Sequence, residues 1–179
     1  MFISAKIKEK NIAEYVLYMW QIEDIIRACG LDIEVIDKTI IQPQEISDED
    51  KEALKKWYKD FCNKMVLQRI QTVGHLHEVA DVSMELTYLH NSLLSYYKDE
   101  KYISLFSEAE KFVEEYKSVS KTPNASNIEL FFSALYGKLM LKLRGKEISE
   151  SSEEAFDAFR KVLGYLSIKF NEMKEGKLV

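Results

Sequence analysis

The segment from His75 to Tyr97 carries the most regular apolar pattern in the sequence. At about 100° per residue, eight of its apolar side chains fall within an arc of roughly 140° on one face of a helix. From Val79 to Leu93 the steps alternate between three and four residues, which is typical of a helix packed lengthwise against its neighbours. We therefore predict a core helix in an up-and-down helical bundle. The eight residues are Leu76, Val79, Val82, Leu86, Leu89, Leu93, Leu94 and Tyr97.

Further helical signals bring the expected number of long or medium helices to about six. Asn11 and Gly30 provide an N-cap and a left-handed C-cap for the first of them, and Ser126 with Glu129 forms a capping box. Two prolines and six glycines leave few interruptions, and no pair of strand candidates is present. The predicted segments are 11–30, 47–72, 75–97, 102–118, 126–145 and 149 onward, with a short helix at 31–41.

The size and composition of the chain fit one soluble globular domain. It has 179 residues, of which 46% are hydrophobic and 31% charged, enough to bury a core without metals or disulfides. We expect an all-α fold and a single domain over residues 1–179. The loop at 118–126, SVSKTPNAS, is the place where an internal break would fall.

Charge and cysteine content exclude several classes of function. A net charge of −5 and the lack of a basic cluster argue against binding to DNA or RNA. Cys29 and Cys62 have no CxxC spacing, which indicates reduced thiols. Since no signal peptide or apolar run of about 18 residues is visible, we expect a cytoplasmic protein without membrane insertion.

The first predicted helix is apolar on nearly all sides. Ile12, Met19 and Ile26 lie on a broad apolar side, yet Val16 and Trp20 lie on the other side, among the charged residues. A helix of this kind is buried, either at the centre of a bundle or under another subunit, which motivates the expectation of a homodimer. The charged residues Glu23, Asp24 and Arg27 share the second side, where a Glu23–Arg27 pair at i,i+4 would be structural.

The three histidines define the candidate site. If the central helix includes residue 75, His75 and His90 project into the apolar arc, Ser83 lies beside His90, and His77 points to the polar side. His75 and His90 are then about 22 Å apart along the helix axis, so they cannot share a metal ion. The candidate pocket consists of His90, His75, Glu23, Asp24 and Ser83. The alternative is that the buried histidines are structural and satisfied by hydrogen bonds.

No motif in the sequence indicates a defined chemistry. The Glu-x-x-His pair of bundle metal sites, a nucleophile elbow and a glycine-rich phosphate loop are all missing. We therefore expect no catalytic residues, no metal and no cofactor.

Four stretches of the sequence resemble a known bacterial family of small helical proteins. They are KIKEKNIAEYVLYMWQIEDIIRA near the N-terminus, GHLHEV and ELTYLHNSLL in the central helix, and FFSALYGKLMLKLRGKEIS further on. The family is known as domain of unknown function 4924. The resemblance covers essentially the whole chain. It implies an all-helical cytoplasmic protein without an assigned activity, and it supplies no site residues.

Two functions follow as expectations. The first is a non-enzymatic helical bundle that acts through contacts with an unidentified protein partner and associates as a homodimer. The alternative is a bundle that binds a small molecule or a metal, or acts as a hydrolase, with a pocket around His90. A closed core around His90 would argue against that alternative, whereas a cavity there would favour it.

Overall fold

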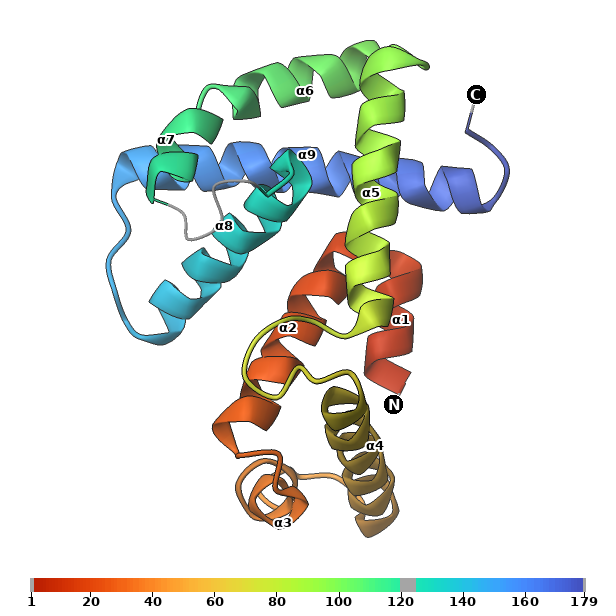
Figure 1. Ribbon diagram of the computed structural model, residues 1–179, viewed down its shortest axis with the longest axis vertical. Coiled ribbons are helices and arrows are strands. Elements are labelled where there is room, and N and C mark those ends of the chain that lie inside the picture. The colour runs from red at the N-terminus through yellow and green to blue at the C-terminus, as the bar shows by residue number, and fades with distance from the viewer. Residues whose placement is uncertain (1, 120–124, 179) are drawn as a thin grey trace.

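The computed structural model describes residues 2–119 and 125–178, and within these ranges every regular element is helical (Figure 1). The prediction of an all-α fold is confirmed. The elements are α1 (Phe2–Lys10), α2 (Ile12–Ala28), α3 (Ile33–Ile36), the π-helical turn η1 (Asp37–Ile41), α4 (Asp48–Leu67), α5 (His77–Ser95), α6 (Glu100–Glu110), α7 (Val113–Val119), α8 (Asn127–Leu143) and α9 (Glu150–Lys174).

The arrangement differs from the expected up-and-down bundle of about six helices. In the described part of the chain there are nine α-helices, because α1 precedes the first predicted helix and the segment 102–118 divides into α6 and α7. The break between α6 and α7 is a turn in which the Phe112 N–H donates to the Ala109 carbonyl. The helices also cross steeply: α9 runs across α5, and α6 lies alongside α9 (Figure 1).

The predicted capping residues hold the helix ends as expected. The Asn11 side chain accepts hydrogen bonds from the backbone N–H groups of Ala13 and Glu14 at the start of α2. Ser126 and Glu129 form the reciprocal capping box of α8. Gly30, with φ of +64°, follows the end of α2 in the left-handed conformation that glycine adopts readily.

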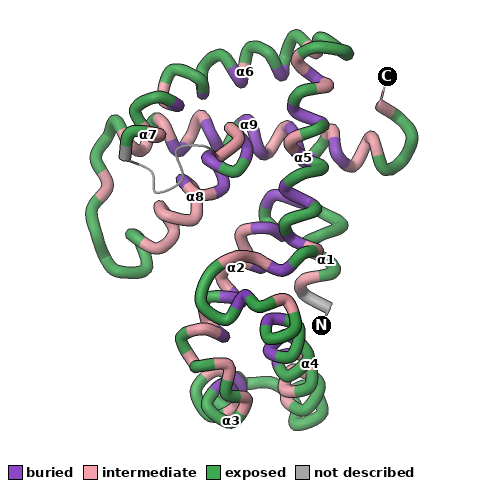
Figure 2. Tube along the Cα trace, in the orientation of Figure 1, coloured by how far each residue is buried: buried purple, intermediate pink, exposed green. Residues whose placement is uncertain are grey.

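The buried hydrophobic residues form one connected core. Figure 2 shows buried positions on α6, α8 and α9, and aromatic rings of these three helices meet one another. Phe131 of α8 stacks on Phe159 of α9 at 4.4 Å between ring centroids, and Phe106 of α6 contacts Phe131 at 6.4 Å. The central helix contributes most of its predicted apolar stripe to this core, from Val79 to Leu93, whereas Tyr97 lies beyond the end of α5 and is 36% exposed. No helix in the described ranges is long and apolar enough to cross a membrane.

Helix α2 is covered from several sides by other helices of the same chain. It packs against α1, α5, α8 and α9, and Ile12, Val16 and Ile26 are completely buried. Trp20, about 80° around the helix from Ile12, is also packed against the core. The chain itself thus accounts for the apolar character that suggested a second subunit, and the homodimer stays a prediction.

The far end of α2 carries the part of the fold that positions the site. There α3, η1 and α4 pack together, and after α4 the chain returns along α2 to the start of α5 (Figure 1). The returning segment, residues 68–76, is not helical, although helices were expected through residue 72 and from residue 75. We call it the 68–76 segment. It brings His75 to α2.

Candidate functional site

Glu23 of α2 is completely buried and binds the 68–76 segment. Its Oε2 lies 2.6 Å from His75 Nδ1, and its Oε1 accepts a hydrogen bond of 2.9 Å from the Leu76 N–H. Leu76 immediately precedes α5, so this carboxylate lies at the positive end of that helix. Glu23 therefore caps α5 from a different helix and fixes the His75 ring at the same time.

Arg27 does not pair with Glu23, contrary to the structural interpretation of the i,i+4 spacing. Its Nη1 binds Asp24 at 2.8 Å, and its Nε and Nη2 donate to the Ile70 carbonyl at 3.4 and 3.3 Å. Nη2 also donates to the Gly74 carbonyl. The physical reason is that the backbone carbonyls of the non-helical 68–76 segment need donors, and Arg27 supplies several from one side chain.

Gly74 is required where the 68–76 segment turns toward α5. Its φ of +97° lies in the region that side chains other than glycine rarely adopt. A Cβ at this position would also approach Ile70 Cγ2 to 3.2 Å. The turn thus presents one carbonyl to Arg27 and places the next residue, His75, beside Glu23.

Trp20 stacks on the other side of the fixed histidine. The rings of Trp20 and His75 are 4.2 Å apart at an interplanar angle of 8°. Tyr136 of α8 meets Trp20 edge-on at 5.6 Å and donates a hydrogen bond of 2.6 Å to Asp24 Oδ2. Burial, together with this bond to Asp24, raises the pKa of Tyr136, so the hydroxyl keeps its proton and acts as the donor.

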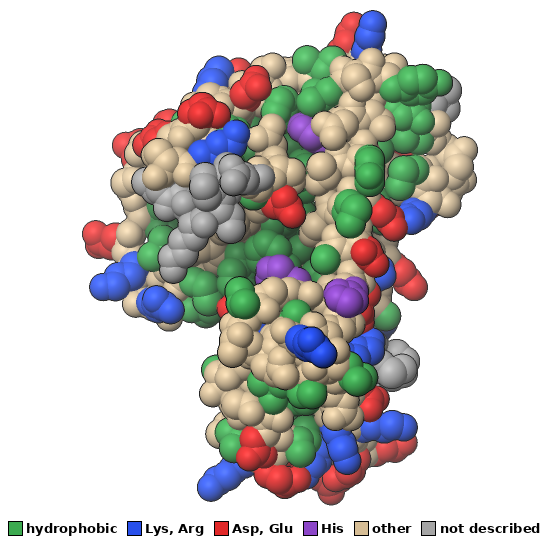
Figure 3. Space-filling model, in the orientation of Figure 1, with side chains coloured by type: hydrophobic (Ala, Val, Ile, Leu, Met, Phe, Trp, Pro, Cys, Tyr) green, Lys and Arg blue, Asp and Glu red, His purple; other side chains and the backbone are tan. Residues whose placement is uncertain are grey.

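These residues line an open pocket of about 370 Å³ between α2, the 68–76 segment and the first turns of α8. Figure 3 shows hydrophobic side chains in a hollow of the surface between α8 and α5. The described lining residues combine two large aromatic rings and a histidine with two carboxylates and two hydroxyls. They are Trp20, Asp24, His75, Ala125, Glu129, Ser133 and Tyr136. We call this the Trp20–His75 pocket.

The structure brings together three of the five candidate site residues. His75, Glu23 and Asp24 all lie at the Trp20–His75 pocket or directly behind it. The reason that His75 lies here, and not in the apolar arc of α5, is that the helix begins at His77. Helical phasing therefore did not apply to residue 75.

His90 and Ser83 lie apart from that pocket, on the buried face of α5. His90 is 5% exposed, its Nδ1 is 2.6 Å from the Tyr102 hydroxyl, and its ring packs edge-on against Phe106 at 4.7 Å. Burial raises the pKa of Tyr102 and lowers the pKa of His90 to about 4. The hydroxyl thus donates to a neutral imidazole. Ser83 bonds the Val79 carbonyl within its own helix.

The fixed orientation of His75 defines what the Trp20–His75 pocket can do chemically. Because Glu23 accepts at Nδ1, the proton of a neutral ring lies on Nδ1, and Nε2 is left as a hydrogen-bond acceptor. The side chain is 37% exposed, with one face covered by Trp20. No group of three metal-binding side chains occurs among the described residues. The arrangement is suited to hydrogen bonding and stacking.

Sequence reasoning did not identify Trp20, Tyr136, Glu129 and Ser133 as pocket residues. Trp20 precedes Glu23 by three positions and shares its side of α2, which was the available signal. Tyr136 follows Trp20 by 116 residues, so only the packing of α8 on α2 brings the two together.

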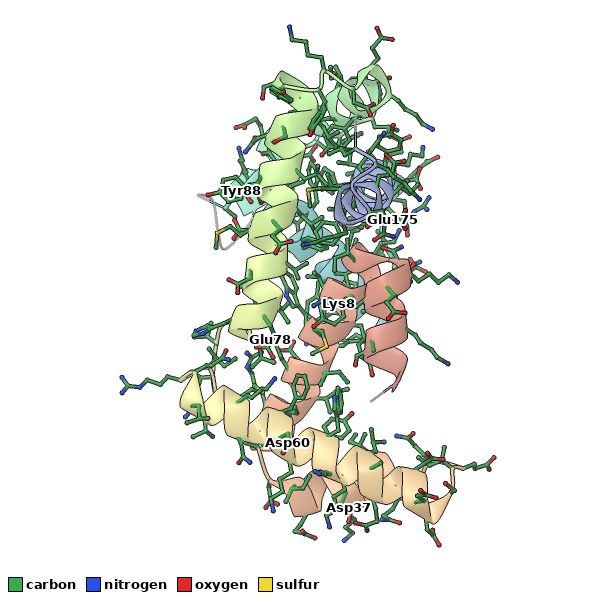
Figure 4. The ribbon with its side chains drawn as sticks, turned by 90° about the vertical axis from the view of Figure 1, so that its right-hand side faces the viewer. Lys8, Asp37, Asp60, Glu78, Tyr88 and Glu175 are labelled. Atoms are coloured by element: carbon green, nitrogen blue, oxygen red, sulfur yellow. The ribbon has the colours of Figure 1, made fainter. Side chains whose placement is uncertain are left out.

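We predict that Glu23→Ala costs roughly 3 kcal/mol of unfolding free energy, because it leaves the Leu76 N–H and the His75 ring without their buried acceptor. Glu23→Gln should cost less, since an amide oxygen still accepts one of the two bonds. Urea unfolding measures both. Asp60→Asn on the exposed side of α4 is the matched control and should leave the midpoint unchanged (Figure 4). An unchanged midpoint for Glu23→Ala would refute the capping role.

We also predict that His90 makes the fold sensitive to acid. The ordinary imidazole pKa is about 6.5 and that of His90 in the fold is about 4, so between these values the unfolded chain binds a proton that the folded chain does not. Stability contributed by neutral His90 is complete above pH 6.5 and falls by roughly 3 kcal/mol as the pH approaches 4. Comparing urea unfolding of the wild type and His90→Gln at pH 7 and pH 5 measures the difference. An NMR titration showing His90 protonating near pH 6.5 would contradict this.

Comparisons with known proteins support one assignment. No curated protein and no solved structure matches the chain. The model of one family matches residues 1–177, in agreement with the resemblance of the four sequence stretches. The chain therefore belongs to the family described as "Domain of unknown function (DUF4924)".

Proposed function

We propose that this protein binds a small organic molecule in the Trp20–His75 pocket. The observation that carries the proposal is the His75 ring, which is fixed by Glu23 at one nitrogen and by Trp20 on one face, while its remaining surface lines an open pocket of about 370 Å³. The closed core around His90 argues against the pocket that the sequence placed there. The proposal keeps the binding of a small molecule from that second expected function and places it at His75.

The pocket has the composition of a ligand site. Small-molecule sites are typically several hundred Å³ in volume, mostly apolar, and carry a few polar groups in fixed positions. Here Trp20 and Tyr136 supply aromatic walls, and Asp24 is held by both Tyr136 and Arg27. A site whose polar groups are already fixed loses little conformational entropy when a ligand binds.

The proposal concerns binding and not catalysis. A Glu–His pair resembles two members of a catalytic triad, but a triad also needs a nucleophile in hydrogen-bond reach of the histidine. Among the described residues, neither hydroxyl of the lining is hydrogen-bonded to His75: the Tyr136 hydroxyl donates to Asp24, and no bond joins Ser133 to His75. No assignment of a reaction is therefore made to His75.

The remaining expectations from the sequence stay part of this proposal. The connected hydrophobic core supports a single domain, and we propose a cytoplasmic location as before.

Association through protein contacts is the second candidate function. It is supported by Met84 and Tyr88, which are one turn apart on α5 and are 54% and 69% exposed. Figure 4 shows Tyr88 on the outer side of this helix.

A fragment library screened by NMR tests the binding proposal. In the background of Trp57→Phe, the remaining indole N–H resonance belongs to Trp20, whose buried Nε1 has no hydrogen-bond partner among the described residues. We expect fragments that shift this resonance and that bind about tenfold more weakly to His75→Ala.

The matched control is His77→Ala, two positions further along, where the histidine is exposed and outside the Trp20–His75 pocket. It should bind the same fragments as tightly as the parent protein does. If no fragment perturbs the Trp20 resonance, or if both histidine variants lose binding equally, the pocket is not the binding site.

A further inference from the structure

The chemistry of the pocket walls restricts the class of ligand. We infer that the ligand is a flat aromatic ring that carries N–H donors and no negative charge, such as an amino-substituted heterocycle. This inference rests on the proposed function, because it concerns the same site. Three features of the described residues support it: a stacking surface, an excess of hydrogen-bond acceptors, and a lining that contains carboxylates but no lysine or arginine.

The stacking surface is the His75 ring. Trp20 lies parallel to it at 4.2 Å, so the face toward Trp20 is covered, and Glu23 occupies Nδ1. The side chain is 37% exposed and lines the pocket, so a ligand there meets the part of the ring that Trp20 and Glu23 leave uncovered. A planar ring that lies against the uncovered face extends an existing stack of two rings, and a saturated ring of the same size gains less from this contact.

The polar groups around this stack are mainly acceptors. His75 Nε2 in the neutral ring, the Asp24 carboxylate and the Glu129 carboxylate all accept hydrogen bonds. Of the donors, the Tyr136 hydroxyl already donates to Asp24 and the Trp20 Nε1 is buried, which leaves the Ser133 hydroxyl beside the three acceptors. A ligand that forms hydrogen bonds with these acceptors must supply N–H or O–H donors of its own.

The charge of the lining disfavours anions. Asp24 and Glu129 line the pocket and Glu23 lies behind His75, whereas the described lining includes neither lysine nor arginine. Arg27 neutralises part of the Asp24 charge, but its remaining bonds go to the Ile70 and Gly74 carbonyls. A carboxylate or phosphate placed here would face like charges in a partly desolvated site.

The N-terminus of α8 also borders the pocket and would by itself attract an anion. A carboxylate of the same chain already occupies this helix terminus. Glu129 is in the first turn of α8, its Oε2 accepts from the Ser126 N–H at 2.8 Å, and the Ser126 hydroxyl accepts from the Glu129 N–H at 3.2 Å. The capping box therefore places a carboxylate where an anionic ligand would otherwise bind.

Four small probes of matched size test the ligand class: benzamidinium, benzamide, benzoate and cyclohexanecarboxamide. The first three share a flat ring and differ in charge, and the fourth replaces the ring of benzamide by a saturated one. Binding is measured at pH 8 on Trp57→Phe protein, by Trp20 fluorescence and by the shift of its indole N–H resonance. We expect benzamidinium and benzamide to bind, and both other probes to bind at least about tenfold more weakly.

A variant with one carboxylate fewer in the lining tests whether charge determines the preference among the probes. Glu129→Gln keeps an acceptor for the Ser126 N–H but removes one negative charge from the lining. It should reduce the preference for benzamidinium over benzoate several-fold, whereas the exposed control Glu147→Gln, outside the pocket, should not change that preference.

The outcomes separate this inference from the proposed function. If benzoate or cyclohexanecarboxamide binds near Trp20 as tightly as benzamide does, the inferred ligand class is wrong. The pocket would still be a binding site. The class is also overturned if none of the four probes shifts the Trp20 resonance while other library fragments do. If nothing in the library shifts it, the proposed function itself is wrong.

Discussion

The buried carboxylate of Glu23 is the interaction on which the arrangement of this fold depends. A completely buried carboxylate is costly unless every oxygen is satisfied, and here one oxygen binds His75 while the other binds the first backbone N–H before α5. Because both partners belong to the segment that follows α4, the requirement to satisfy one side chain of α2 fixes where α5 begins.

Arg27 completes this attachment one turn later on α2. It binds the carbonyls of Ile70 and Gly74, so a cation and an anion four residues apart hold the same segment by complementary backbone groups. Spacing of this kind is usually interpreted as a pair that neutralises itself. In this protein each charge instead has its own partner, and the unusual backbone of Gly74 makes that geometry possible.

The sequence predicted those parts of the fold that depend on local periodicity. The apolar stripe of α5 from Val79 to Leu93, the Asn11 cap of α2 and the Ser126–Glu129 capping box are as expected, because each depends on residues within a few positions of one another. Helix α1 was not predicted, since its short charged sequence shows little periodicity. The crossing of α9 over α5 was also missed, because helix stripes do not specify crossing angles.

The candidate site was predicted only in part, because local periodicity does not show which distant residues meet in the fold. Glu23, Asp24 and His75 were identified as polar residues in apolar surroundings, but His75 was assigned to a helix that in fact starts two residues later. The expected pocket around His90 depended on this histidine projecting into the apolar arc. His90 is buried there, but its Nδ1 is bonded to the Tyr102 hydroxyl. The contact of Trp20 with Tyr136 joins positions far apart in the chain, so no local sequence pattern predicts it.

The walls of the Trp20–His75 pocket come from three distant parts of the sequence: α2, the 68–76 segment and α8. No short stretch of the unfolded chain can reproduce this surface. A ligand of the pocket therefore binds the folded chain and not the unfolded one. Such a ligand, at one hundred times its dissociation constant, adds about 2.7 kcal/mol to the unfolding free energy. That gain is shared by the whole chain, so occupancy of a site near α2 also protects α8 and α9 from unfolding.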